Sequence, residues 1–211
     1  PTRRSSDLGT CFVTGFPPVG PFYTWTASTP VYNRHTLETG TGTDPYGGFP
    51  VVAPGGGAFS LRLGNSGTGA QCERAEYYIR VPAGSSNFAL IYHYAVVLED
   101  PTHSTAEQPR FVVRAVDSAT DVDVPCALYN YIAGSLPGFL VSTVRSPQGI
   151  FPFYKPWATG SINLSGMGGK TVAIRLIAQD CTATGHFGYG YFDASCGLFA
   201  IDSKICDDTL A

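Results

Sequence analysis

Acidic side chains follow directly after the most apolar stretch of the sequence. Glu99 and Asp100 come at the end of the run 87–98, and Asp193 lies in a later apolar stretch. Calcium is bound by several oxygen ligands, mainly carboxylates and carbonyls, so these three carboxylates are candidate ligands of a structural Ca²⁺. The alternative is that they cap turns, as an Asp before Pro commonly does. No other cofactor is required.

A second set of candidates is aromatic and lies in the loop-rich parts of the sequence. Exposed rings would favour carbohydrate binding, because sugars stack their apolar faces on Trp and Tyr. The alternative is that the rings fill the ends of a sandwich, where aromatic side chains bury large areas, and we expect this for Trp157. The candidates are Trp25, Tyr46, Tyr129, Tyr131, Tyr154 and Trp157.

The residue types that most often carry catalysis form no recognisable motif. The four histidines, His35, His93, His103 and His186, include no HxH or HxxxH pair, and there is no GxSxG elbow or P-loop. His93 falls in an expected buried strand and is interpreted as a core residue. A glycosidase would need two opposed carboxylates in a cleft, but we expect the carboxylates to be solvated surface groups. The carboxylates in question are Glu38, Glu73, Glu76, Glu99, Asp100 and Asp193. We therefore predict that the chain is not an enzyme.

The cysteines form an even set without a CxxC pair or zinc-finger spacing. They are Cys11, Cys72, Cys126, Cys181, Cys196 and Cys206. Disulfides in an oxidising compartment fit this pattern best, and buried free thiols in a cytosolic protein are the alternative. The sequence does not fix the pairing. Our guess is Cys126 with Cys181, Cys196 with Cys206 and Cys11 with Cys72.

The elements that must position these residues are strands, because Gly or Pro interrupts nearly every stretch long enough for a helix. The run 87–98 is apolar on both faces, which indicates a central strand covered on both sides. The expected strands are 59–63, 76–81, 87–98, 110–116, 170–178 and 186–193. Strands at this spacing, joined by turn-rich loops, predict a two-sheet antiparallel β-sandwich stapled by disulfides.

The remaining segments are expected to be less regular. Residues 1–8 are polar and unpatterned and read as a non-native or disordered leader, so the module would span residues 9–197. Residues 11–57 are expected to form an arm over the core, and the Pro-rich connection 117–159 to mix short edge strands with loops.

Composition and charge exclude some partners. The chain of 211 residues has 25 Gly, 16 Pro and only 14% charged residues, with a net charge of −3. Its Lys and Arg residues are scattered, so no basic patch is available to bind nucleic acid. No apolar run is long enough to span a membrane.

Several of these segments resemble the jelly-roll module of secreted Bacteroidetes surface proteins, namely the adhesins and gliding-motility-associated proteins exported by the type IX system. The resemblance is carried by Arg34-His35-Thr36, by residues 59–65 (FSLRLGN), by residues 94–111 (YAVVLEDPTHSTAEQPRF), by Lys155-Pro156-Trp157 and by residues 186–196 (HFGYGYFDASC). It implies an extracellular or cell-surface location and a binding or structural role, and it carries over no catalytic residue. Residues 198–211 resemble the opening of an immunoglobulin-like repeat, or alternatively a strand that pairs with a neighbouring subunit. Asp117-Ser118-Ala119 and Asp208-Thr209-Leu210 resemble the Bacteroidetes O-glycosylation signal, with Ser118 and Thr209 as acceptors.

Three functions remain open. The leading one is a non-catalytic surface module for adhesion within a larger secreted protein, with a surface glycan or protein as its ligand. The second is a self-assembling extracellular filament or matrix subunit, whose partners are copies of itself. The third is a carbohydrate-binding module.

Overall fold

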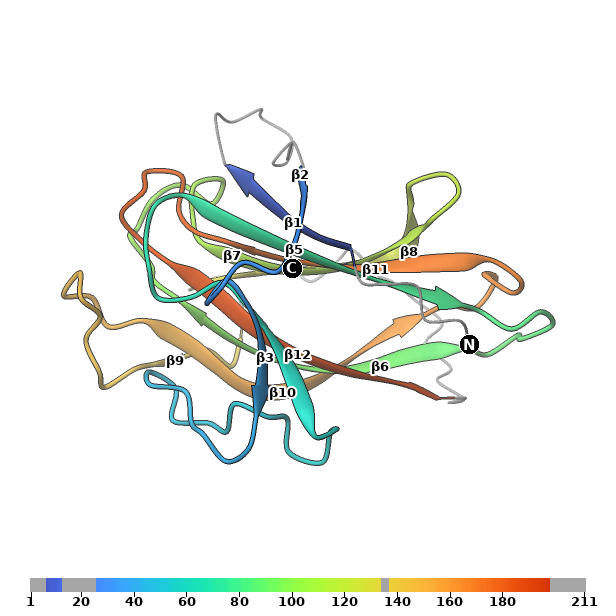
Figure 1. The fold of residues 1–211 in the computed structure, drawn as a ribbon, viewed down its shortest axis with the longest axis horizontal. Helices are drawn as coiled ribbons and strands as arrows, with labels where there is room; N and C mark the ends of the chain where they lie inside the picture. Colours follow the sequence, from blue (N-terminus) through green and yellow to red (C-terminus); the bar gives the residue numbers. More distant parts are fainter. Residues whose placement is uncertain (1–6, 13–25, 134–136, 198–211) are drawn as a thin grey trace.

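The chain folds as two antiparallel β-sheets of six strands each that face one another as two layers (Figure 1). The computed structural model describes residues 7–12, 26–133 and 137–197. Across the first sheet the strands are β2 (Thr26–Ser28), β1 (Asp7–Phe12), β5 (Gln71–Arg80), β11 (Thr171–Gln179), β7 (Arg110–Asp117) and β8 (Val122–Ile132). Across the second sheet they are β3 (His35–Thr39), β4 (Phe59–Leu63), β12 (Gly188–Gly197), β6 (Ala89–Leu98), β10 (Phe153–Asn163) and β9 (Leu140–Val141).

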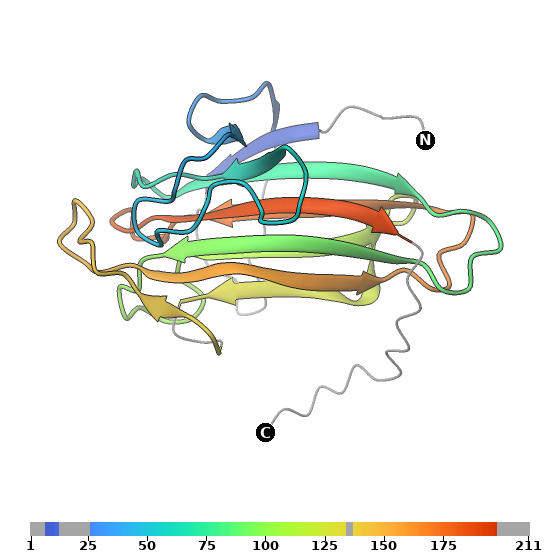
Figure 2. The ribbon, with the colours of Figure 1, turned by 90° about the horizontal axis from the view of Figure 1, so that it is seen from below.

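This architecture confirms the expected all-β class and the pair of antiparallel sheets. In the part of the chain that the structure describes, every regular element is a strand, and no helix is long and apolar enough to cross a membrane. Figure 2 shows β12, β6 and β10 running side by side in the second sheet.

The main core lies between the two sheets and follows the alternation of the strands. β6 has neighbours on both sides, and its even-numbered residues from Leu90 to Leu98 point into this core. Its residues Ala95 and Val97 pack in a second cluster on the outer face. β11 contributes Val172, Ile174, Leu176 and Ala178 to the main core. The expected central position of β6 is confirmed.

Alternating glycines in β12 let a large ring into the core. Tyr189 and Tyr191 point to the outer face, so Gly188 and Gly190 point inward. A Cβ atom on Gly190 would lie 2.5 Å from the ring of Phe111, which is fully buried. Only glycine leaves room for Phe111 at this position.

A loop formed by residues 40–57 covers the outer face of the second sheet. Its residues Phe49 and Val51 pack on Ala95, Val97 and Tyr191 in the second cluster. In Figure 1 this loop, drawn in blue, lies below the lower sheet. The expected arm over residues 11–57 is therefore wrong in its bounds, because β2 and β3 are strands of the two sheets and, of the residues described, only 40–57 form a covering loop. This loop lies on the back of one sheet and not over the core between the sheets.

The connection 117–159 contains longer strands than expected. β8 and β10 have 11 residues each, and β10 pairs with β6 along most of its length. The register of the β10–β6 pair shifts between Lys155 and Ala158 of β10, next to Pro156. The register of the β7–β8 pair shifts between Arg114 and Val116 of β7, opposite the start of β8. Bulges at these places accommodate residues that a regular ladder would exclude.

The first strand begins inside the expected leader. Asp7 and Leu8 lie in β1 and pair with Glu76 and Ala75 of β5. The expected boundary after residue 8 is therefore wrong. Residues 1–6 and the expected terminal strand 198–211 lie outside the described residues.

The expected Cys126–Cys181 disulfide is not formed. Cys181 is buried with a free thiol, whereas Cys72 and Cys126 are each in a disulfide. The backbone register sets Cys11 directly opposite Cys72, as the expected Cys11–Cys72 pair requires. The side chains of Cys11 and Cys196, and all of Cys206, lie outside the described part of the chain, so the remaining pairings stay predictions.

Candidate functional site

The candidate aromatic residues that the structure describes pack into the fold and do not form the expected platform. Tyr46, Tyr154 and Trp157 are partly buried against the second cluster, beneath or within the covering loop. The indole Nε1 of Trp157 donates a hydrogen bond to the carbonyl oxygen of Pro50 at 2.6 Å. The expectation that Trp157 would act as a packing residue is confirmed.

Two further aromatic candidates, Tyr129 and Tyr131, point into the main core. Tyr131 is buried, and its ring stacks on Tyr94 with a centroid distance of 4.4 Å. Tyr129 packs against the same core and donates its hydroxyl to the carbonyl oxygen of Ser161. Burial raises the pKa of both phenols. Neither ring is placed to bind a ligand, and Trp25 lies outside the described residues.

The expected calcium ligands lie apart. Asp193 is directly opposite His93 in the middle of the β12–β6 ladder, whereas Glu99 follows Leu98 at one end of that ladder. The two residues are separated by about six residues along the strand, or about 20 Å. One ion could not bind both.

Each of these carboxylates has a local partner. Glu99 is fully buried and accepts a hydrogen bond from the backbone N–H of Phe187. Asp100 accepts hydrogen bonds from the Thr102 amide and the Gln108 side chain, which is the turn-capping role given as the alternative. Asp193 accepts a hydrogen bond from the backbone N–H of Gly57 at 2.8 Å.

The candidate carboxylates of a glycosidase are not the solvated surface groups that we expected. Glu73, Glu76 and Glu99 are 1%, 4% and 0% exposed. Glu73 pairs with Arg34, and Glu76 pairs with Arg74 and Arg175 on the outer face of the first sheet. Burial raises the pKa of Glu99, whereas the two arginines hold the pKa of Glu76 below its usual range despite its burial. Their contacts stabilise the fold and do not present an opposed pair to solvent.

The four histidines divide into two kinds. Nδ1 of His35 accepts the Val31 amide, and His93 is half-buried beside the Thr159 hydroxyl, so His93 is less enclosed than expected. His103 and His186 come together with Cys181 at the end of the sandwich. Burial lowers the pKa of His186, and His103 nearby adds to this effect. The sequence signal for this cluster is the spacing of four residues between Cys181 and His186, and the third member comes from a distant loop.

One candidate glycosylation residue can be placed. Ser118 lies in the exposed turn after β7, where its hydroxyl donates to the carbonyl oxygen of Thr171. Thr209 lies outside the described residues. Modification of either residue stays a prediction.

The feature best suited to hold a ligand is a cleft of about 940 Å³ between the two sheets. It lies between β3, β4 and β12 of the second sheet and β5 of the first sheet. Its lining includes Leu37, Phe59, Leu61, Tyr77, Ile79, Phe88 and Phe192. These residues belong to the inward-facing set that forms the main core elsewhere.

The cleft is open because the sheets are incompletely covered here. β1 pairs with β5 only as far as Glu76, so within the described residues Tyr77–Arg80 have no β1 neighbour. Leu37, Phe59 and Tyr77 remain 63%, 52% and 48% exposed. Sequence analysis placed Phe59 and Tyr77 in strands but did not identify them as site residues, since strand alternation does not reveal where two sheets separate.

Polar groups flank this apolar surface. Asp193 lies on its β12 side and is half-buried, and Arg80 lies on its β5 side and is exposed. Among the described residues, no ion pair includes Arg80. Because Asp193 lies on the same face of β12 as Tyr191 and accepts the Gly57 amide of the covering loop, its carboxylate faces away from the cleft. The cleft therefore combines aromatic faces with one cation, Arg80, near its rim.

Comparisons with known proteins give only distant structural likenesses. No family model and no curated protein matches the chain. The K1 cleaved adhesin domain of Lys-gingipain from Porphyromonas gingivalis W83 is 14% identical with a TM-score of 0.39, over 93% of this chain and 99% of that domain. TmCBM61, solved in complex with β-1,4-galactotriose, is 8% identical with a TM-score of 0.39, over 68% of this chain and 72% of that one. The family 11 carbohydrate-binding module from Clostridium thermocellum is 11% identical with a TM-score of 0.29, over 88% and 94%.

Values this low assign neither a family nor a function to this chain. An adhesin domain of a Bacteroidetes protein is among these structures, but export by the type IX system and the source of the chain stay predictions.

Proposed function

We propose that this chain is a non-catalytic binding module of an extracellular surface protein, and that it holds a glycan in the cleft between its two sheets. The observation that carries this proposal is the exposure of Leu37, Phe59 and Tyr77, which face inward but are not covered. Inward-facing residues of a sandwich normally bury one another. Apolar surface left open in a concave site favours a ligand that removes it from water.

The chemistry of the cleft suits a sugar. A pyranose ring has an apolar face and a rim of hydroxyl groups. Phe59 and Tyr77 offer ring faces at the opening, and Arg80 at the rim offers a donor for a hydroxyl group. The volume lies within the usual range of ligand sites, about 300–1,000 Å³. An adhesion role follows if the glycan belongs to a cell surface.

A protein ligand is the second candidate, because an extended peptide could pair with the edge of β5 at Tyr77–Arg80, which has no neighbouring strand on that side among the described residues. Such a ligand would bind through its backbone and would depend less on the two rings. The filament hypothesis rests on residues 198–211, outside the described part of the chain, and no contact described here bears on it.

The test is binding of the purified chain to a panel of neutral and acidic polysaccharides, followed by calorimetry with the best oligosaccharide. We expect Phe59→Ala and Tyr77→Ala each to weaken binding at least about tenfold, equivalent to about 1.4 kcal/mol. Tyr32→Ala is the matched control, because Tyr32 is 96% exposed and does not line the cleft. It should bind like the unmodified chain.

Two results would overturn the proposal. One is the absence of binding to any polysaccharide by a chain that melts cooperatively. The other is a measurable affinity that neither cleft substitution changes. Binding of an extended peptide in place of glycans, with loss on substitution at the β5 edge, would establish the second candidate.

A further inference from the structure

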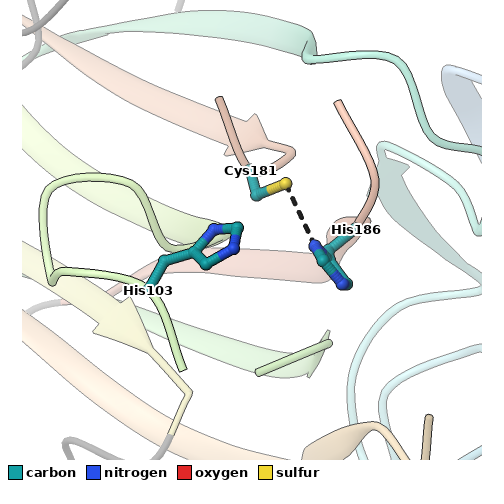
Figure 3. A group of neighbouring side chains, drawn as sticks. All are labelled: His103, Cys181 and His186. Atoms are coloured by element: carbon teal, nitrogen blue, oxygen red, sulfur yellow. Dashed lines mark hydrogen bonds between the residues drawn. The ribbon is translucent and has the colours of Figure 1, made fainter. Parts of the chain in front are cut away.

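Three side chains that bind transition metals meet at one end of the sandwich (Figure 3). His103 lies in the connection between β6 and β7, and Cys181 and His186 lie in the connection between β11 and β12. Their ligand atoms all lie within 4.8 Å of one another. We propose that His103, Cys181 and His186 form a binding site for zinc, which would tie these two connections together.

The positions of the ligand atoms are close to those of a zinc site. The Sγ atom of Cys181 lies 3.3 Å from Nδ1 of His186. Two ligands at zinc–sulfur and zinc–nitrogen distances of about 2.3 and 2.1 Å in a tetrahedron lie about 3.6 Å apart. The rings of His103 and His186 are nearly perpendicular, with centroids 5.4 Å apart. Small rotations of the two imidazoles would therefore complete three ligand positions.

An unsatisfied nitrogen independently indicates a ligand. Nδ1 of His103 is buried and has no hydrogen-bond partner among the described residues. A buried polar atom without a partner is unfavourable by about 1–3 kcal/mol, and coordination to a metal ion would remove this cost. Cys181 is also buried and keeps its thiol free, unlike Cys72 and Cys126.

The scaffold holds the three ligands before any ion binds. Backbone hydrogen bonds close the connection 181–186, from the Cys181 amide to the His186 carbonyl at 3.0 Å and from the Thr184 amide to the Cys181 carbonyl at 3.2 Å. The Thr182 amide reaches the Glu107 carbonyl of the other connection. The Gln108 side chain donates to the carbonyl oxygen of His103. These contacts reduce the entropy that ligand binding would otherwise cost.

The ligand set selects the class of metal. Calcium and magnesium prefer oxygen ligands, whereas one thiolate and two imidazoles suit zinc. Binding replaces the thiol proton of Cys181, which is released to solvent, with a sulfur–metal bond. Three protein ligands leave a fourth position for water. The proposed zinc site anchors two loops to each other, and it does not depend on the glycan cleft.

The test uses the full chain after dialysis against a chelator. Adding Zn²⁺ should give binding of one equivalent by calorimetry and should raise the melting temperature. Co²⁺ should bind at the same site and give the absorption band of a cobalt–thiolate bond. Ca²⁺ should give neither effect.

Matched variants decide whether the signal comes from this cluster. His103→Gln and Cys181→Ser should each weaken Zn²⁺ binding at least tenfold, and Cys181→Ser should also abolish the cobalt–thiolate band. His93→Gln, which alters a half-buried histidine outside the cluster, should leave both signals unchanged. If the buried Cys181→Ser variant fails to fold, His103→Gln is sufficient, because His103 is partly exposed. Absence of stoichiometric Zn²⁺ binding, or binding that His103→Gln does not weaken, would overturn the proposal.

Discussion

Buried carboxylates in this protein have assigned partners that explain their positions. The Asp44 carboxylate accepts the hydroxyls of Tyr189 and Tyr191 at 2.7 and 2.9 Å. The Asp180 carboxylate accepts the backbone amides of Gln71 and Gly188. Burial of charged groups is unfavourable unless they are paired in this way. These contacts explain why so many acidic residues sit inside a module for which we predict no catalysis.

Glu73 leads to a prediction about pH. Burial raises the pKa of Glu73 to about 7, although Arg34 beside it lowers this value. The folded protein therefore keeps this proton up to about pH 7, whereas the unfolded chain releases it near its ordinary pKa of 4.5. Because the folded state binds more protons between these values, the free energy of unfolding falls as pH rises through this window. The expected loss from this group is about 1–3 kcal/mol.

Urea unfolding at several pH values between about 5 and 8 measures this slope. Glu73→Gln should reduce the slope, and part of it should remain because burial raises the pKa of Asp180 to about 8. Glu38→Gln removes a more exposed carboxylate and serves as the control. A slope that is the same in Glu73→Gln and in the unmodified chain would show that Glu73 does not hold its proton as described.

At the residue scale, patterns along one strand could be predicted, and contacts between distant loops could not. The alternation of glycine and tyrosine in β12 is visible in the sequence and places the two residue types on different faces, with Gly190 against Phe111. His103 and Cys181 are far apart in the sequence and meet only because β6, β7, β11 and β12 end at the same place. A search for ligand pairs within one segment does not find such a site.

At the scale of elements, the covering loop depends on one residue. Asp44 is 2% exposed and binds the amides of Tyr46 and Gly47 within the loop, as well as two tyrosine hydroxyls of β12. We expect Asp44→Ala to lower the free energy of unfolding by about 2–4 kcal/mol, because it leaves several buried donors without an acceptor. Limited proteolysis should then cut residues 40–57 faster.

A surface carboxylate provides the comparison. Asp123→Ala removes an exposed ion pair with Arg114, which should change the free energy of unfolding by no more than about 1 kcal/mol. Equal stability and equal cleavage of Asp44→Ala and Asp123→Ala would contradict the anchoring role of Asp44.

Strands with strong apolar patterns were predictable, and strands with prolines were not. β4 has the expected bounds, and β6, β7 and β11 differ from expectation by one or two residues at their ends. β8 contains Pro125 and β10 contains Pro156, so the sequence predicted short edge strands and loops in place of these two long strands. The bulges that accommodate these residues depend on the neighbouring strand and leave no mark in the local sequence.

At the scale of the whole molecule, the sandwich is closed over most of its area and open at one place. Where the two sheets are in contact, the inward-facing residues of β6 in one sheet and of β7 and β11 in the other are buried. Around Leu37, Phe59 and Tyr77 the same alternation produces exposed apolar surface. The outcome depends on whether an inward-facing side chain meets a partner from the other sheet, which is a property of the complete fold that no single strand sequence contains.

The most direct test of the proposed binding function is a crystal structure of the chain with the oligosaccharide that binds most tightly. We predict a sugar ring between Phe59 and Tyr77, with a hydroxyl group hydrogen-bonded to Arg80. A sugar bound instead on the outer face of the second sheet, near Trp157 and the covering loop, would contradict the assignment of the cleft as the binding site.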